Sequence, residues 1–234
     1  MVFGTDLPLA APDALAGLEA WLGDGHRSVR ADLNRAEDVG AVVDAARAFG
    51  INVLINNAGI GSFGLFETQD WEAVDAVLAT NLVAPMRLTH ALLPQLTRQR
   101  RATIVNIGST FGSVPFAGFA AYSAAKAGLR GFSQALRREL ADTGVAVVHL
   151  APRAIATTLN TAAVDALNRE LGNRSDSADA VADAIVDALR RGSHERHLGF
   201  PERLFARLNG IAPSLIDRGV AGKLAAIKRH AATG

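Results

Sequence analysis

Three apolar runs separated by longer helix-like segments constrain the fold of this chain more than any other feature. The runs are INVLI (51–55), the apolar part of ATIVNIGS (102–109) and VAVVHLA (145–151). Continuous apolar runs are typical of parallel strands buried on both faces, and their alternation with helical segments indicates βαβ units. The pattern therefore predicts an α/β fold, a doubly wound Rossmann-like parallel sheet flanked by helices.

Flanking residues suggest where the other elements begin and end. HRSVRADL (26–33) reads as a short strand, and Asn34 with Glu37 resembles a capping box that opens a helix ending at Gly50. Further helices are expected from about Thr68 to Arg98 with a kink at Pro85, from about Phe119 to Thr143, and over 178–192. RHLGF (196–200) is expected to be an edge strand.

The chain contains no stretch that reads as a linker between domains. Its 234 residues fit one α/β domain. We therefore predict a single Rossmann-like domain over residues 1–234, with 194–234 as a C-terminal helical extension.

Composition excludes several classes of function. The net charge of +1 makes no electrostatic case for nucleic-acid binding, and the absence of cysteine excludes disulfides and thiolate chemistry. No apolar run approaches the ~20 residues of a membrane span, and the N-terminus does not resemble a secretory signal. No His or acid spacing suggests a metal site. These features lead us to expect a cytoplasmic protein.

Tyr122, the single tyrosine, lies four residues before Lys126 in AAYSAAKAGL. On a helix this spacing places both side chains on one face, one turn apart. A nearby ammonium lowers the pKa of a phenol, so the pair could act as a general acid/base near neutral pH. A partly buried tyrosine with a lysine extending to solvent is the structural alternative.

The surrounding motifs give this pair a context. Ser109 stands thirteen residues before Tyr122 at a strand end, Asn81 lies in a helical segment, and Asn56–Asn57–Ala58–Gly59 follows the run 51–55. Four elements in this order resemble the short-chain dehydrogenase/reductase family, over roughly residues 26 to 160. The resemblance implies an oxidoreductase that interconverts a carbonyl and an alcohol with NAD or NADP.

The resemblance also implies roles for single residues. Tyr122 would exchange a proton with the substrate oxygen, Lys126 would lower the pKa of Tyr122 and bind the nicotinamide ribose, and Ser109 would donate a hydrogen bond to the same oxygen. Asn81 would hold a water that connects Lys126 to solvent. The residues expected at the cofactor are Asp32, Asn56, Ala58, Gly59, Tyr122, Lys126, Pro152 and Thr157.

For several of these positions a structural role is an open alternative. Asp32 could equally be an acid at a helix start, and Asn81 could bond its own helix backbone. Arg153 replaces a glycine of the family's cofactor loop, and could reshape the nicotinamide pocket, reach an acidic substrate or lie on the surface. For His149, at the end of a strand, we expect a buried histidine with satisfied hydrogen bonds.

The start of the chain departs from the family. The expected T-G-x-x-x-G-x-G turn has no match in residues 1–35, so we expect a chain short of about one βα unit at its N-terminus. VFGTD (2–6) could be the family's second strand, with Asp6 near the adenosine ribose, or a degenerate first strand. The alternative function is a catalytically silent family member that binds dinucleotides weakly and acts as an oligomer or interaction partner.

Two segments bear on partners. Residues 158–172 are expected to form an apolar substrate lid, which favours a hydrophobic small-molecule substrate. From His194 onward the tail carries seven Lys/Arg and three Asp/Glu. Because apolar stripes at helical spacing usually dock on the body or on a sister subunit, we favour a homo-oligomer over membrane contact.

Overall fold

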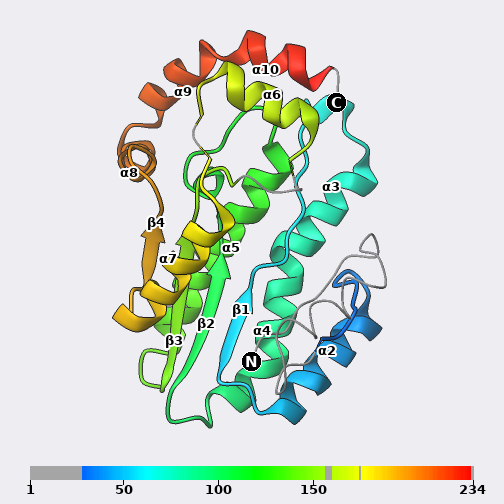
Figure 1. The fold of residues 1–234 in the computed structure, drawn as a ribbon, viewed down its shortest axis with the longest axis vertical. Helices are drawn as coiled ribbons and strands as arrows, with labels where there is room; N and C mark the ends of the chain where they lie inside the picture. The colour runs from blue at the N-terminus through cyan, green and yellow to red at the C-terminus, as the bar shows by residue number, and fades with distance from the viewer. Residues whose placement is uncertain (1–27, 156–159, 174, 233–234) are drawn as a thin grey trace.

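A four-stranded parallel sheet forms the centre of the computed structural model, which describes residues 28–155, 160–173 and 175–232 (Figure 1). The strands are β1 (Val53–Asn56), β2 (Ala102–Ile107), β3 (Val145–Ala151) and β4 (Glu195–His197), in the order β1-β2-β3-β4. All three strand pairs are parallel. The predicted α/β class is confirmed.

Helices cover the two faces unequally. On one face, α2 (Ala36–Phe49) packs on α4 (Ala84–Leu96), α4 contacts β1 and β2, and α5 (Ala120–Glu139) contacts β2 and β3. On the other face lies α7 (Ala178–Arg191), which contacts β3 (Figure 1). The larger apolar core therefore lies between the sheet and α2, α4 and α5.

The unequal cover corrects the expectation that the run 51–55 is buried on both faces. Val53 and Ile55 are 38% and 44% exposed, whereas Leu54 packs against the larger core. β1 lies at the end of the described sheet, and its alternate side chains point away from α4. The described helices leave that side of β1 open.

The segment 28–33 is not a strand, contrary to the sequence-based expectation. Residues 28–32 have no regular secondary structure and a turn begins at Leu33, although Ala31 and Leu33 enter the core. The proposed capping box is also absent. The Asn34 side chain accepts a hydrogen bond from Thr80, and α2 begins after Arg35 without a side-chain cap.

The helix expected over 68–98 runs instead from Trp71 to Leu96. It consists of α3 (Trp71–Leu78), a π-helical segment (Ala79–Val83) and α4. Pro85 has no N–H to donate to the preceding turn, and the π-helical segment lies immediately before it. By length and composition this helix could cross a membrane, but here Leu88, Leu92 and Leu96 bury its inner face in the core.

The remaining sequence-based boundaries agree closely. β3 matches the predicted 145–151, and both Gly50 and Gly192 end their helices in the left-handed conformation. α5 ends at Glu139 rather than at Thr143. The edge strand β4 covers 195–197 instead of 196–200.

The C-terminal part of the chain wraps around one end of the sheet (Figure 1). It comprises α8 (Glu202–Ile211), α9 (Pro213–Ala221) and α10 (Leu224–Ala231), with α6 (Ala162–Glu170) beneath α10. Arg229 and His230 of α10 both bond the Glu170 carboxylate of α6, at 2.5 Å and 2.8 Å. The predicted lid residues 160–172 are therefore attached to the C-terminal helix.

Candidate active site

Tyr122 and Ser109 come together at the carboxyl end of the sheet. Tyr122 lies in the first turn of α5, and Ser109 follows β2 at the N-cap of the short 3₁₀ helix Thr110–Gly112. Ser109 lies near enough to Tyr122 for its side chain to lower the pKa of the phenol. Ser109 Oγ also accepts a hydrogen bond of 3.2 Å from the backbone of Phe111, which holds the hydroxyl in place.

Lys126 lies one turn along α5 from Tyr122. Its Nζ is 5.7 Å from the centre of the Tyr122 ring and donates to the carbonyl of Ile107, at the end of β2, over 2.9 Å. The side chain is buried. An ammonium has three donors, and Ile107 takes one of them within the described residues, so two remain for a ligand.

Asn81 joins this group through the loop after β1. It lies in the π-helical segment, where it donates to the Ile60 carbonyl over 2.8 Å and accepts from the Ile60 amide over 3.1 Å. Asn81 thus bonds another loop, and not its own helix. A Cβ at Gly59 would lie 2.6 Å from Asn81 Oδ1 and 3.6 Å from Lys126 Nζ, so only glycine fits there.

Burial dominates the electrostatics of the pair. It raises the pKa of Tyr122, although the hydrogen bond with Ser109 acts in the opposite direction. Burial also lowers the pKa of Lys126 to about 8. The sequence suggested a lowered pKa for Tyr122 beside Lys126, whereas the structure gives a raised one. The reason is that burial of the phenol away from water outweighs the other effects.

Comparisons with known proteins agree with this arrangement. Residues 11–168 match the model of the short chain dehydrogenase family. The chain belongs to the short-chain dehydrogenase family. It is 35% identical over 147 residues to the 3-oxoacyl-acyl-carrier-protein reductase FabG of Vibrio cholerae, a match that covers 62% of this chain and 60% of the relative.

Solved structures of the family have the same fold. A short-chain dehydrogenase from Streptomyces avermitilis aligns with a TM-score of 0.77 at 29% identity, covering 94% of this chain and 87% of that one. A short-chain dehydrogenase from Sphingobium yanoikuyae in complex with NADPH aligns with a TM-score of 0.74 at 27% identity, covering 92% and 84%.

Among the residues expected at the cofactor, Asn56 ends β1, and Ala58 and Gly59 follow in the next turn. The Asn56 amide donates to Asn106 over 2.7 Å and to Thr89 over 3.3 Å, while its buried Oδ1 has no partner in the described residues. Ala58 packs against the larger core. Asn56 therefore connects strands and helix, and Gly59 is the residue of this turn that lies beside Lys126.

Asp32 lies in the turn that precedes α2. Its carboxylate accepts from the backbone of Asn34 over 2.9 Å, and its own amide donates to Asp38 over 2.8 Å. These bonds build the turn before α2. The bonds are those of an acid at a helix start, and a contact of Asp32 with the cofactor stays a prediction.

The segment after β3 connects to the Ser109 loop. The buried carbonyl of Pro152 accepts two bonds from Thr110, at 2.9 Å and 3.1 Å. Arg153 forms an ion pair with Asp176 and lies 3.9 Å from Glu202, so its guanidinium is used within the protein. Thr157, Asp6 and the segment 2–6 lie outside the described residues.

A row of polar residues crosses the sheet beneath the site. Asn56, Asn106, His149 and Glu195 are register partners on four successive strands, and register partners share one face. Sequence reasoning missed Asn106, although a polar residue inside an apolar run is a recognisable signal. Asn106 donates to Ser133 of α5 over 2.9 Å.

The expectation of a satisfied His149 is wrong. The ring is fully buried, and neither nitrogen has a hydrogen-bond partner in the described residues. Burial lowers its pKa to about 4, against an opposing effect of Glu195. A Cβ at Gly108 would lie 2.2 Å from His149 Nε2. The imidazole ring therefore packs directly against Gly108, the residue before Ser109.

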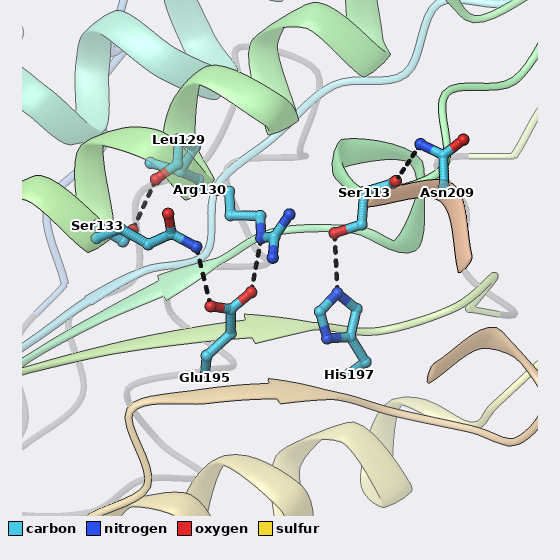
Figure 2. A network of polar contacts seen from close by, with 8 residues as sticks. Ser113, Leu129, Arg130, Ser133, Glu195, His197 and Asn209 are labelled. Atoms are coloured by element: carbon cyan, nitrogen blue, oxygen red, sulfur yellow. Dashed lines mark hydrogen bonds and ion pairs between the residues drawn. The ribbon is translucent and has the colours of Figure 1, made fainter. Parts of the chain in front are cut away.

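Polar contacts join β4 to the helices around the site (Figure 2). Glu195 accepts from Arg130 of α5 over 2.6 Å, and His197 bonds Ser113 over 2.8 Å. Asn209 of α8 donates to the carbonyl of the same Ser113 over 2.9 Å. The end of the Ser109 loop is thereby connected to the sheet edge and to α8.

Aromatic side chains surround Tyr122 on its other side. Phe111 and Phe119 both meet the Tyr122 ring edge-on, with centroids 6.4 Å away. Phe116 stacks on Phe111 at 5.3 Å, and Phe63 lies 5.0 Å from Phe119. Phe63 and Phe116 in turn pack against α6 and α10.

Proposed function

We propose that this chain is an oxidoreductase that interconverts a carbonyl and an alcohol with NAD or NADP. The observation that carries the proposal is the grouping of three side chains at one edge of the sheet: Ser109 at the end of β2, Tyr122 in the first turn of α5, and buried Lys126 one turn further along. Ser109 is near enough to lower the pKa of the Tyr122 phenol, so both hydroxyls can serve one substrate oxygen. Its relatives support the class of reaction, but the chain covers only 60% of the length of the Vibrio FabG, so the whole activity stays a proposal.

The residues divide the chemistry among them. The Tyr122 hydroxyl gives a proton to the substrate oxygen in reduction and takes it back in oxidation, while Ser109 donates a hydrogen bond to the same oxygen where charge develops. Lys126, with a pKa of about 8, is mostly protonated at neutral pH. Its positive charge offsets the negative charge of the phenolate that Tyr122 becomes when it gives its proton to the substrate. A nicotinamide cofactor, when bound, supplies or accepts the hydride.

The residues present fit the nicotinamide end of such a cofactor. Lys126 uses one N–H for the Ile107 carbonyl, so its other two can donate to ribose hydroxyls. Glycine at position 59 has no side chain to block access to Lys126 Nζ. Asn81 fixes this loop through its two bonds to Ile60. The NADPH complex of the Sphingobium relative supports this class of cofactor.

The aromatic residues around Tyr122 favour an apolar substrate. Phe111 and Phe119 contact the reacting tyrosine, and behind them α6 and α10 add further apolar side chains. We therefore propose a hydrophobic ketone or alcohol as the substrate. We further propose that the protein is a cytoplasmic homo-oligomer. Each chain would form a single domain with residues 194–234 as a C-terminal extension.

The test is turnover of a panel of aliphatic and aryl ketones at saturating NADH or NADPH. Tyr122→Phe should lower kcat/KM by about 100-fold or more, since general acid–base catalysis contributes roughly 10²–10⁴. The melting temperature should stay close to that of the parent. Ser133→Ala removes a hydroxyl further along α5 and should keep turnover. Parent-like activity of Tyr122→Phe would refute the proposed proton transfer.

A further inference from the structure

Helix α8 has the reverse of the usual orientation for an amphipathic helix. Its side toward the body carries Asn209, which bonds the Ser113 carbonyl (Figure 2), and Glu202, which lies 3.9 Å from Arg153. The opposite side carries Leu204, 54% exposed, and Ile211, 85% exposed. A surface helix normally turns its apolar stripe toward the core. Here polar contacts attach the helix, and the apolar stripe faces outward.

The exposed apolar surface continues beyond α8. Phe200, just before the helix, is 79% exposed, and Leu215 of α9 is 51% exposed. Neither α8 nor α9 contains a buried residue. Single exposed apolar residues are common, but a series along two consecutive helices marks an interaction surface. We define this outer surface as Phe200, Leu204, Ile211 and Leu215.

Positive charge accompanies this outer surface. Arg203 and Arg207, four residues apart, form an exposed stripe beside Leu204 and Ile211, and the described residues give neither arginine an ion-pair partner. Residues 200–234 contain six Lys/Arg and two Asp/Glu, whereas the rest of the chain contains eighteen and twenty-one. Within residues 200–215, which carry the outer surface, Arg203 and Arg207 outweigh Glu202, and the larger part of the positive excess follows in 216–234.

The charge distribution decides between possible partners. A second copy joined through this surface around a twofold axis would bring the same basic residues together, and like charges would oppose the contact. Anionic lipid offers negative head groups for the arginines and an apolar layer for the phenylalanine, leucine and isoleucine side chains. Basic and apolar residues side by side on a helix suit the membrane interface.

We propose that α8 and α9 dock this outer surface on an anionic phospholipid membrane, with the helices lying in the interface. Sequence alone favoured docking of the apolar stripe on the body or on a sister subunit; the hydrogen bond of Asn209 to Ser113 turns the stripe outward. Because Ser113 belongs to the loop that begins at Ser109, the proposed membrane surface lies close to the candidate active site.

Co-sedimentation of the full chain with vesicles tests the proposal. The chain should bind vesicles of equal parts phosphatidylcholine and phosphatidylglycerol at least about tenfold more strongly than vesicles of phosphatidylcholine alone, because each arginine near an anionic surface contributes about fivefold. Added salt should weaken the binding by screening. Absence of binding to the mixed vesicles at low salt would overturn the proposal, and would leave an acidic protein as the partner to test next.

Paired variants separate the apolar and the electrostatic contributions. Leu204→Gln with Ile211→Gln, and separately Arg203→Gln with Arg207→Gln, should each weaken binding by about tenfold or more. Arg100→Gln with Arg101→Gln, an exposed pair at the opposite end of the sheet, should bind like the parent. Equal losses in this control would show that net charge alone drives the binding, and would refute a defined surface.

Sedimentation velocity tests the competing partner. The parent and the Leu204→Gln/Ile211→Gln variant should have the same association state in solution. If the variant dissociates a parent oligomer, a second copy covers this surface and the membrane proposal is wrong.

Discussion

His149 is the residue whose environment departs most from what its chemistry requires. A buried ring nitrogen without a partner costs free energy, and this ring has two such nitrogens among the described residues. Lys126, Arg130 and His197 each oppose its protonation, while Glu195 favours it. The neutral ring fills the space against Gly108 that a Cβ would otherwise occupy.

Replacement of His149 by leucine should change the acid stability of the protein. The pKa of His149 is about 4 in the folded chain and about 6.5 when unfolded. Between these values the unfolded chain binds the extra proton, so the free energy of unfolding falls as the pH falls, by up to about 3 kcal/mol. His149→Leu should lose this part of the acid sensitivity and be at least as stable as the parent at pH 7.

Urea unfolding at pH 7 and at pH 4 measures the effect. His90→Leu removes an exposed histidine from α4 and should keep the acid sensitivity of the parent. If His149→Leu loses as much stability as the parent between the two pH values, His149 is not held neutral by burial.

At the scale of elements, the close approach between α5 and the loop after β2 determines the geometry of the site. A Cβ at Gly112 would lie 2.7 Å from the backbone oxygen of Lys126. Backbone cannot move aside as a flexible side chain can. The glycine therefore lets the loop that carries Ser109 reach the helix that carries Tyr122.

Two glycine substitutions at these elements should have opposite effects. Gly112→Ala should destabilise the protein by about 1–3 kcal/mol through overpacking, and should lower activity because α5 shifts. Gly131 lies within α5, and the position of its missing Cβ is open space. Gly131→Ala should therefore stabilise the protein by about 0.5–1 kcal/mol. Thermal unfolding of both variants is the measurement, and a neutral Gly112→Ala would show that the two elements can separate without cost.

At the scale of the whole molecule, we expect the chain to bind the nicotinamide half of a dinucleotide more strongly than the pyrophosphate half. Gly59, Lys126 and Tyr122 fit the nicotinamide half. The pyrophosphate half normally requires backbone amides at a glycine-rich helix start, and residues 1–35 of this sequence contain no T-G-x-x-x-G-x-G motif. β1 is also open on one side, with Val53 and Ile55 exposed.

The 234-residue chain should therefore bind NAD and NADP poorly. Hydrogen bonds to a charged group contribute ~1.5–3 kcal/mol each, so the loss of two weakens binding by roughly a hundredfold to ten-thousandfold. Calorimetric titration should show this difference from a chain extended at its N-terminus by a glycine-rich βα unit. Micromolar affinity of the 234-residue chain for either cofactor would contradict the prediction, and would mean that another segment binds the pyrophosphate.

The sequence by itself determined the α/β class, the strands at 102–107 and 145–151, and the pairing of Tyr122 with Lys126. These follow from local properties: continuous apolar runs, glycine at helix ends and the spacing of side chains on a helix. It also placed Ser109 and Tyr122 at the same edge of the sheet, because Ser109 follows the carboxyl end of a strand and Tyr122 lies in the first turn of the helix that comes next.

Only the tertiary structure decided the features that depend on what lies opposite a residue. It exposed one side of β1, since no described helix covers it, and it gave 28–32 no regular secondary structure. It raised the pKa of Tyr122 through burial, where the sequence suggested the opposite. It left His149 without partners and turned the apolar stripe of α8 outward. Periodicity shows that a helix has an apolar side, but the direction of that side depends on contacts between residues as distant in sequence as Ser113 and Asn209.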